Sequence, residues 1–132
     1  MATKKSDPFQ QFVRGIIRST IQEINGNQPE KPITPPKLHS EAWYRDRLAK
    51  KLQGKTEVFT PVGRIDIVTD TEIIELKNVK NWKGAIGQIK SYGKFYPDHQ
   101  LRVHLFGAIT KTQLQQVHSI CSAENIILTW ES

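Results

Sequence analysis

Two short segments rich in β-branched residues, separated by a polar break, constrain the fold of this chain more than any other feature. Residues 64–69 and 72–77 flank a break that contains Asp70 and Thr71. This pattern is typical of two antiparallel strands joined by a tight turn. If the turn is centred on Asp70 and Thr71, the register places Asp66 directly opposite Glu75.

Alternation along these strands divides their side chains between two faces of the hairpin. One face carries Asp66, Val68, Ile73, Glu75 and Lys77. The other face is wholly apolar and carries Ile65, Ile67, Ile74 and Leu76. Directly opposed residues hold their Cβ atoms roughly 4.5–5.5 Å apart, so two facing carboxylates would repel each other unless a cation lay between them.

This arrangement of acids predicts a metal site with Asp66 and Glu75 as ligands. Mg²⁺ is usually held by one or two carboxylates, together with waters and phosphate oxygens. Lys77 would then position or deprotonate a water, or stabilise charge on phosphoryl oxygens. The alternative is an ordinary exposed sheet face with solvated acidic and basic side chains.

A helix is predicted on each side of the hairpin. In the first, from Ser40 to Leu52, Glu41 lies on the same stripe as Leu48. A carboxylate on an inward stripe needs a partner, but Glu41 would also suit a first turn capped by Ser40, where the helix dipole favours an acid. The spacing of Glu41 is compatible with both interpretations.

The second helix, from Trp82 to Tyr96, has an apolar stripe and a separate basic stripe. The basic row suits a polyphosphate backbone such as that of DNA, although a solvated lysine face would look the same. Its members, with one lysine just before the helix, are Lys80, Lys83, Lys90 and Lys94.

The order of these elements resembles the PD-(D/E)XK nuclease superfamily, which has the restriction-endonuclease-like fold. The resemblance covers roughly residues 38–130 and rests on a helix with Glu41, a strand with Asp66, the run Glu75-Leu76-Lys77, and a helix with Gly87-Gln88 and Tyr92. One departure is Ile65, which stands where the superfamily pattern has proline.

The resemblance implies a Mg²⁺-dependent DNA endonuclease, with Mn²⁺ as a substitute and a homing or restriction role. Asp66, Glu75 and the Leu76 carbonyl would hold the metal, and Lys77 would serve the attacking water. Glu41 would assist the metal site, and Gln88 would be an accessory catalytic residue. The alternative function is a non-catalytic nucleic-acid-binding module on the same fold.

The remaining segments complete an α/β prediction. Strands are expected at residues 57–61, 101–106 and 126–130, and a helix at 111–122 with Cys121 inward. The result is a mixed central sheet flanked by helices, forming a nuclease domain over residues 38–132. The spacing of the four histidines matches no zinc site.

The apolar spacing of residues 1–26 predicts a separate amphipathic helix, and the prolines of residues 27–37 predict an extended linker. The helix would either mediate a dimer or higher homo-oligomer or pack on its own domain. Its arginines interrupt the apolar run, so we expect neither a signal peptide nor a membrane span, and a cytoplasmic location. The net charge of +6 and the pI near 9.6 favour a polyanionic partner such as double-stranded DNA.

Overall fold

A five-stranded mixed sheet forms the centre of the computed structural model, which describes residues 34–132. The strands are adjacent in chain order: β1 (Lys55–Thr60), β2 (Gly63–Val68), β3 (Glu72–Asn78), β4 (Gln100–Phe106) and β5 (Ile126–Glu131). The first three strands form an antiparallel meander, whereas β3, β4 and β5 are parallel. Each parallel connection contains a helix, as such crossovers require.

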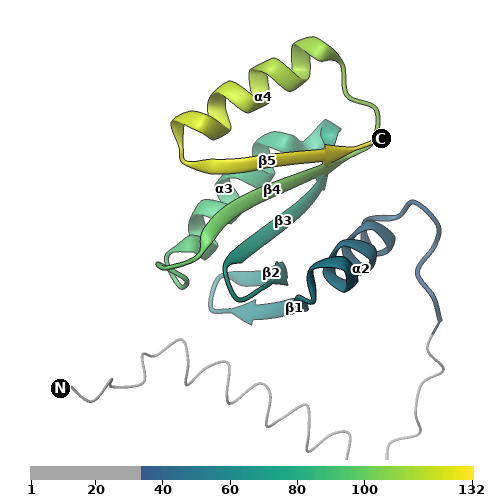
Figure 1. Cartoon of the computed structure of the whole chain (residues 1–132), viewed down its shortest axis with the longest axis vertical. Coiled ribbons are helices and arrows are strands. Elements are labelled where there is room, and N and C mark those ends of the chain that lie inside the picture. Colours follow the sequence, from purple (N-terminus) through teal and green to yellow (C-terminus); the bar gives the residue numbers. More distant parts are fainter. Residues whose placement is uncertain (1–33) are drawn as a thin grey trace, which may run out of the picture.

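The helices cover both faces of this sheet. They are α2 (Glu41–Leu52), the short 3₁₀ helix η1 (Val79–Asn81), α3 (Trp82–Gly93) and α4 (Lys111–Ala123). Helix α2 lies on one face of the sheet, and α3 and α4 lie on the other (Figure 1). The predicted α/β class with a mixed sheet flanked by helices is therefore confirmed.

Local sequence signals explain where these helices begin. Before α2, the side chain of Ser40 accepts a hydrogen bond from the Trp43 backbone N–H at 3.2 Å. Before α4, Thr110 and Gln113 form a capping box, in which each side chain bonds the backbone of the other. Such caps satisfy backbone donors that have no partner inside the helix.

Two apolar clusters hold the layers together, one on each face of the sheet. The cluster under α2 contains Tyr44, Leu48, Ala49, Ile67, Ile74, Leu76 and Phe106. The cluster under α3 and α4 contains Ile65, Ile73, Val79, Ala85, Ile89, Tyr92, Val103, Leu105, Val117, Cys121 and Ile126. Cys121 is thus a core residue, as its position on the inward face of the helix predicted.

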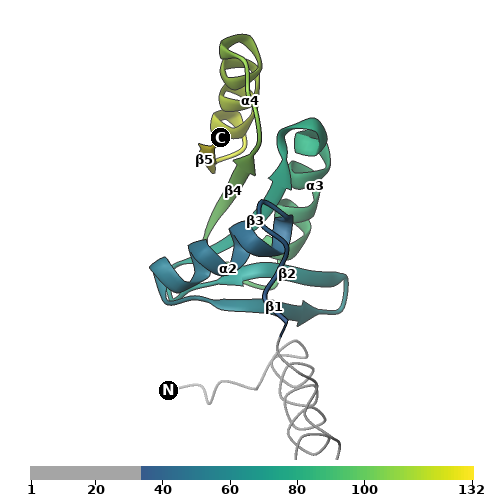
Figure 2. The ribbon, with the colours of Figure 1, turned by 90° about the vertical axis from the view of Figure 1, so that its right-hand side faces the viewer.

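The predicted hairpin register is confirmed. Ile67 stands opposite Ile74, and Val68 stands opposite Ile73. The pairing of β2 with β3 ends at Ile67, because the β1–β2 hairpin then turns across the direction of β4 (Figure 2). The two strands therefore diverge at Asp66.

One predicted face assignment is wrong. The alternation predicts Ile65 on the same face as Ile67, but Ile65 packs in the cluster on the α3 side and Ile67 in the cluster under α2. Side chains do not alternate regularly between the two faces here, because β2 is no longer paired with β3 and because Glu57 on the neighbouring strand β1 has a positive φ of 53°. Glu57 lies between the residues that pair with Ile65 and Ile67, so the distortion falls where the two side chains part.

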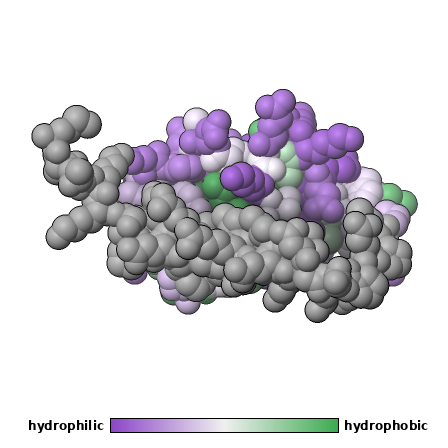
Figure 3. Space-filling view, turned by 90° about the horizontal axis from the view of Figure 1, so that it is seen from below, coloured by the Kyte–Doolittle hydropathy of each residue, from purple (hydrophilic) through white to green (hydrophobic). Residues whose placement is uncertain are grey.

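The predicted N-terminal helix at 1–26 and most of the linker lie outside the described residues, and residues 34–37 have no regular secondary structure. Within the described range, no helix has the length and apolar character that a membrane crossing needs. Seen from below, the visible part of the described surface is mainly hydrophilic, with small hydrophobic areas among the polar side chains (Figure 3).

Candidate metal centre

Three acidic side chains from three different elements meet where β2 and β3 diverge. Glu41 comes from the first turn of α2, Asp66 from β2 and Glu75 from β3. Each offers one carboxylate oxygen, and these oxygens all lie within 4.8 Å of one another. The two acids that the hairpin register placed opposite each other are therefore close in space, and the helix adds a third.

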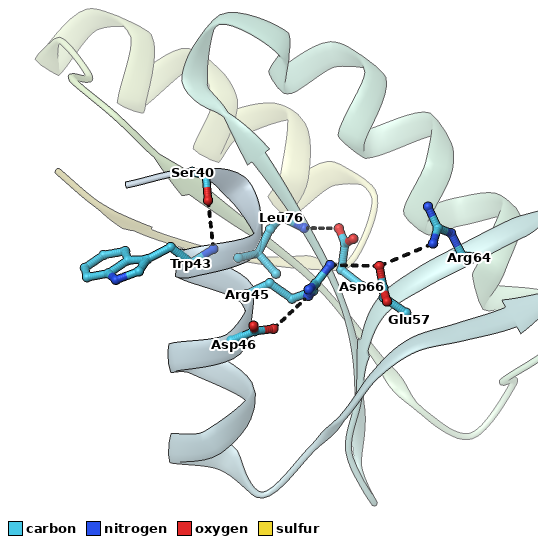
Figure 4. Close-up of polar contacts among 8 residues, drawn as sticks. All are labelled: Ser40, Trp43, Arg45, Asp46, Glu57, Arg64, Asp66 and Leu76. Carbon is cyan, nitrogen blue, oxygen red and sulfur yellow. Dashed lines mark hydrogen bonds and ion pairs between the residues drawn. The ribbon is translucent and has the colours of Figure 1, made fainter. Parts of the chain in front are cut away.

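The Asp66 carboxylate fills the gap that opens between the strands. Its Oδ2 accepts a hydrogen bond from the Leu76 backbone N–H at 2.8 Å (Figure 4). In an extended strand, the N–H and C=O of one residue point to the same edge. The Leu76 carbonyl therefore points to the edge on which Asp66 lies, as a metal ligand at this position would require.

Glu75 is the most deeply buried member of the cluster. It is 3% exposed, and its Oε2 atom has no hydrogen-bond partner among the described residues. Burial raises the pKa of Glu75 strongly, and the adjacent Asp66 carboxyl raises it further by sharing a hydrogen bond and by its charge. A buried acid with an unpaired oxygen is costly, and a bound cation would remove that cost.

The donor set suits a hard divalent ion. Carboxylate and carbonyl oxygens are the ligands that Mg²⁺ and Mn²⁺ prefer, and the described part of the cluster contains neither histidine nor cysteine. Asp66, Glu75 and the Leu76 carbonyl would hold such an ion. Glu41 lies on the solvent side and would complete the set directly or through a water.

Both interpretations of Glu41 describe its position correctly. It lies in the first turn of α2 directly after the Ser40 cap, and it also faces the other two acids. Partial burial raises the pKa of Glu41 and the Asp66 charge adds to this, whereas Lys77 and Arg45 oppose it. The helix N-terminus thus brings a third negative charge into the site.

Lys77 lies near the acids, as its place two residues after Glu75 predicted. Its ammonium group is close enough to act electrostatically on both Glu41 and Glu75. Since the side chain is only half buried, it can reach solvent and the carboxylates alike. Lys77 therefore provides a positive charge next to the acids from the same strand as Glu75.

Gln88 is exposed on α3, and no hydrogen bond links it to the carboxylates in the described structure. Tyr92, one turn later, is buried instead; burial raises the pKa of its hydroxyl, and the charges of Glu75 and Asp66 add to the shift. Tyr92 belongs to the apolar stripe of this helix and Gln88 does not. That stripe is the sequence signal that identifies Tyr92 as the residue facing inward.

A second polar group beside the site was not predicted from the sequence. The Glu57 carboxylate accepts hydrogen bonds from Arg45 at 3.0 Å and from Arg64 at 3.3 Å (Figure 4). Arg45 follows Glu41 by one helical turn, and Arg64 precedes Asp66 by two strand positions. Those spacings place each arginine on the same side as an acid, and they are the signal that identifies the pair.

The predicted lysine row is exposed but does not form one uniform surface. Lys90 forms an ion pair with Glu124 at 2.8 Å, and Lys83 lies 5.7 Å from the Trp82 ring centre. Lys90 and Lys94 line an open cavity of about 590 Å³ at the end of α3 that lies next to the start of β4. Lys80 precedes α3, so it lies roughly 20 Å from Lys94 at 1.5 Å per helical residue.

Comparisons with known proteins identify relatives of part of the chain. It is 38% identical over 84 residues to one KilA-N domain-containing protein of Acanthamoeba polyphaga mimivirus, covering 64% of this chain and 34% of that protein. Two others from the same virus are 38% identical over 110 residues and 31% identical over 105 residues, covering 83% and 80% of this chain. The chain spans only about a quarter to a third of the length of these relatives. No family model matches the chain, and no solved structure matches it.

Proposed function

We propose that this chain is a Mg²⁺-dependent DNA endonuclease of the PD-(D/E)XK superfamily, with a restriction-endonuclease-like core and a homing or restriction role. The observation that carries the proposal is the buried, partnerless oxygen of Glu75 inside a cluster of three carboxylates. A purely structural site would gain stability by losing these charges. Their retention beside Lys77 is explained by binding of a cation and a phosphate.

The residues have distinct roles in the proposed reaction. Asp66, Glu75 and the Leu76 carbonyl would hold the ion, and Glu41 would complete the outer side of the site. When bound, Mg²⁺ supplies positive charge that stabilises the phosphoryl oxygens as the ester is cleaved.

Lys77 orients the attacking water and offers an N–H to a phosphoryl oxygen. The water oxygen forms a bond to phosphorus and gives up a proton, one P–O ester bond breaks, and the leaving oxygen takes up a proton. The products are a phosphate monoester and a free hydroxyl.

Double-stranded DNA is the proposed substrate, because the chain carries a net charge of +6 and polyanions are its natural partners. Two copies are proposed to act together, since one site per chain cuts one strand at a time. Gel filtration with and without DNA tests this: a mass equal to one chain under both conditions contradicts a dimer. A cytoplasmic location is proposed with it.

Cleavage of a random duplex library tests the function without a known target sequence. The full chain is incubated with the library and Mg²⁺ or Mn²⁺, with a chelator control, and cut ends are captured and sequenced. We expect ion-dependent ends that disappear for Asp66→Asn. Binding of DNA without any cut ends would refute the nuclease and favour the non-catalytic nucleic-acid-binding module.

A further inference from the structure

The tip of the β1–β2 hairpin exposes apolar side chains next to the candidate metal centre. Phe59 is 43% exposed and Val62 is 58% exposed, and both lie within six consecutive residues, 59–64. Pro61 between them is also exposed. Single exposed apolar residues need no explanation, but a group on one turn marks a contact surface.

The turn that presents these side chains is held in one conformation. The Thr60 hydroxyl donates to the Gly63 carbonyl at 2.7 Å and accepts from the Val62 N–H at 3.1 Å. Gly63 has a φ of 138°, and a Cβ there would come within 2.8 Å of the Tyr92 hydroxyl. Helix α3 therefore supports the turn from behind, and the exposed side chains are preorganised.

The hairpin tip is close to the acids. Phe59 stands opposite Arg64, and Arg64 precedes Asp66 by two positions on the same strand, which is roughly 7 Å along a β-strand. The Tyr92 hydroxyl behind the turn experiences the charges of Asp66, Glu75 and Arg64 together. The hairpin tip is therefore within reach of a polymer whose phosphate lies at the carboxylates.

The charge of the tip complements a polyanion. The Arg64 guanidinium lies 5.9 Å from the Phe59 ring centre, and its side chain is 56% exposed. Its partner Glu57, which also binds Arg45, occupies the distorted position opposite Asp66 with a φ of 53°. Backbone strain of this kind collects at functional sites, and here it aligns two guanidinium groups beside the acids.

We propose that the β1–β2 hairpin tip contacts DNA next to the cleaved phosphate, with Arg64 binding a neighbouring backbone phosphate and with Phe59 and Val62 contacting bases. A two-stranded β-ribbon fits into the major groove, and apolar side chains contact base edges or enter base steps. The proposal rests on the proposed function, because it takes DNA as the ligand of the adjacent site.

Binding in the presence of a chelator tests the hairpin separately from cleavage. The full chain and its variants are equilibrated with a random duplex library, bound DNA is sequenced, and affinity is measured by fluorescence anisotropy at several salt concentrations. We expect Arg64→Gln to weaken binding evenly across sequences and to lower the salt slope by about one. Phe59→Ser and Val62→Ser keep the slope but change the base preference.

Matched controls lie on α4, away from the tip. Ile120→Ser replaces an apolar residue that is 39% exposed, and Lys111→Gln removes an exposed cation; both should keep wild-type affinity and preference. Thermal unfolding verifies that each variant is folded. Wild-type behaviour of all three hairpin variants overturns the inference, as does a wild-type chain that binds no DNA.

The two proposals fail in different ways. A chain that binds DNA through the hairpin but cuts nothing refutes the endonuclease and keeps the hairpin contact. A chain that cuts DNA while Arg64→Gln, Phe59→Ser and Val62→Ser bind and select like the wild type keeps the endonuclease and refutes the hairpin contact.

Discussion

Two buried polar groups occupy neighbouring strands of one sheet, and only one of them is fully satisfied. His104 on β4 is 5% exposed, and its ring nitrogens each have a partner, Thr129 Oγ1 and Glu131 Oε2, both at 2.7 Å. Glu75 on β3 is buried to a similar degree but leaves Oε2 without a hydrogen-bond partner in the described structure.

The proposed metal site accounts for this difference. A hydrogen-bonded buried side chain contributes modestly to stability, whereas an unsatisfied one costs free energy. The Arg102 Nε also donates a hydrogen bond to Thr129 at 2.9 Å. The network around His104 is therefore a set of structural hydrogen bonds in which both ring nitrogens have partners. The Glu75 carboxyl has no such set of partners among the described residues, and the proposed cation would supply the one that is missing.

The largest expected effect is on DNA cleavage. Lys77→Ala and Asp66→Asn should lower the single-turnover cleavage rate by about 10²–10⁴-fold, the usual range for a group that handles a proton or charge in the transition state. His104→Gln serves as the matched control, because it changes a buried polar group outside the acidic cluster. An equal loss for His104→Gln, measured on folded protein, would remove the distinction between the two groups.

The next largest effect is on the free energy of unfolding, which should fall when His104 is replaced and rise when Glu75 is replaced. His104→Leu removes the ring nitrogens that bond Thr129 Oγ1 and Glu131 Oε2 and should lower the free energy of unfolding by about 1–3 kcal/mol. Glu75→Gln removes a buried acid beside Asp66 and should raise it by roughly 1 kcal/mol in a chelator. Urea unfolding measures both.

Added Mn²⁺ provides the control for that experiment. An ion that binds only the folded state stabilises it by RT ln(1 + [L]/Kd), about 2.7 kcal/mol at a hundredfold excess over Kd. The wild type and His104→Leu should show this gain, and Glu75→Gln should lose it. A gain of equal size in Glu75→Gln would show that the ion binds elsewhere.

Much of this arrangement followed from local patterns in the sequence. Alternating and helical periodicities predicted every described strand and α-helix to within a few residues, and the polar break at Asp70 predicted the pairing of Ile67 with Ile74 and of Val68 with Ile73. These signals succeed because they depend on neighbours in the chain and on one buried face. The approach of Glu41 was one of two alternatives, since a capped acid and an inward acid have the same spacing.

What the sequence did not predict depends on contacts between distant elements. The divergence of β2 from β3 moved Ile65 to the other face, and no periodicity records such a break. The Glu57 pairing with Arg45 and Arg64 joins α2 to the hairpin, and the Lys90–Glu124 pair joins α3 to the end of α4. These ion pairs form only in the tertiary fold. The sequence therefore showed a basic stripe but did not show which of its lysine side chains are paired with an acid.

The pH dependence of stability should differ between the two groups. Burial lowers the pKa of His104 from 6.5, more than the adjacent Glu131 raises it, so its contribution is present above pH 6.5 and is lost as pH falls. The pKa of Glu75 is raised from 4.5, so in a chelator its contribution is present below pH 4.5 and declines as pH rises.

Thermal unfolding between pH 5 and 9 separates the pH dependence of stability that His104 causes from the one that Glu75 causes. In a chelator, His104→Gln should lose the rise of stability between the acidic and neutral range, and Glu75→Gln should lose the decline toward alkaline pH. Saturating Mn²⁺ should flatten the alkaline decline in the wild type, because the carboxylate is then the favoured form. A decline that persists in Glu75→Gln would assign it to another group.

The smallest effect is expected for two surface lysines, one with and one without an acidic partner in the described part of the chain. Lys90 already has a partner in Glu124, whereas Lys80 forms no ion pair within the described residues and lies nearer to the acidic cluster in sequence. Lys90→Gln should therefore change stability by no more than about 1 kcal/mol, as expected for an exposed pair. It should also leave DNA affinity almost unchanged, while Lys80→Gln lowers the salt slope of binding by about one. Anisotropy at several salt concentrations measures both variants, and a larger loss for Lys90→Gln would show that the DNA contacts the C-terminal end of α3 instead of the segment that contains Lys80.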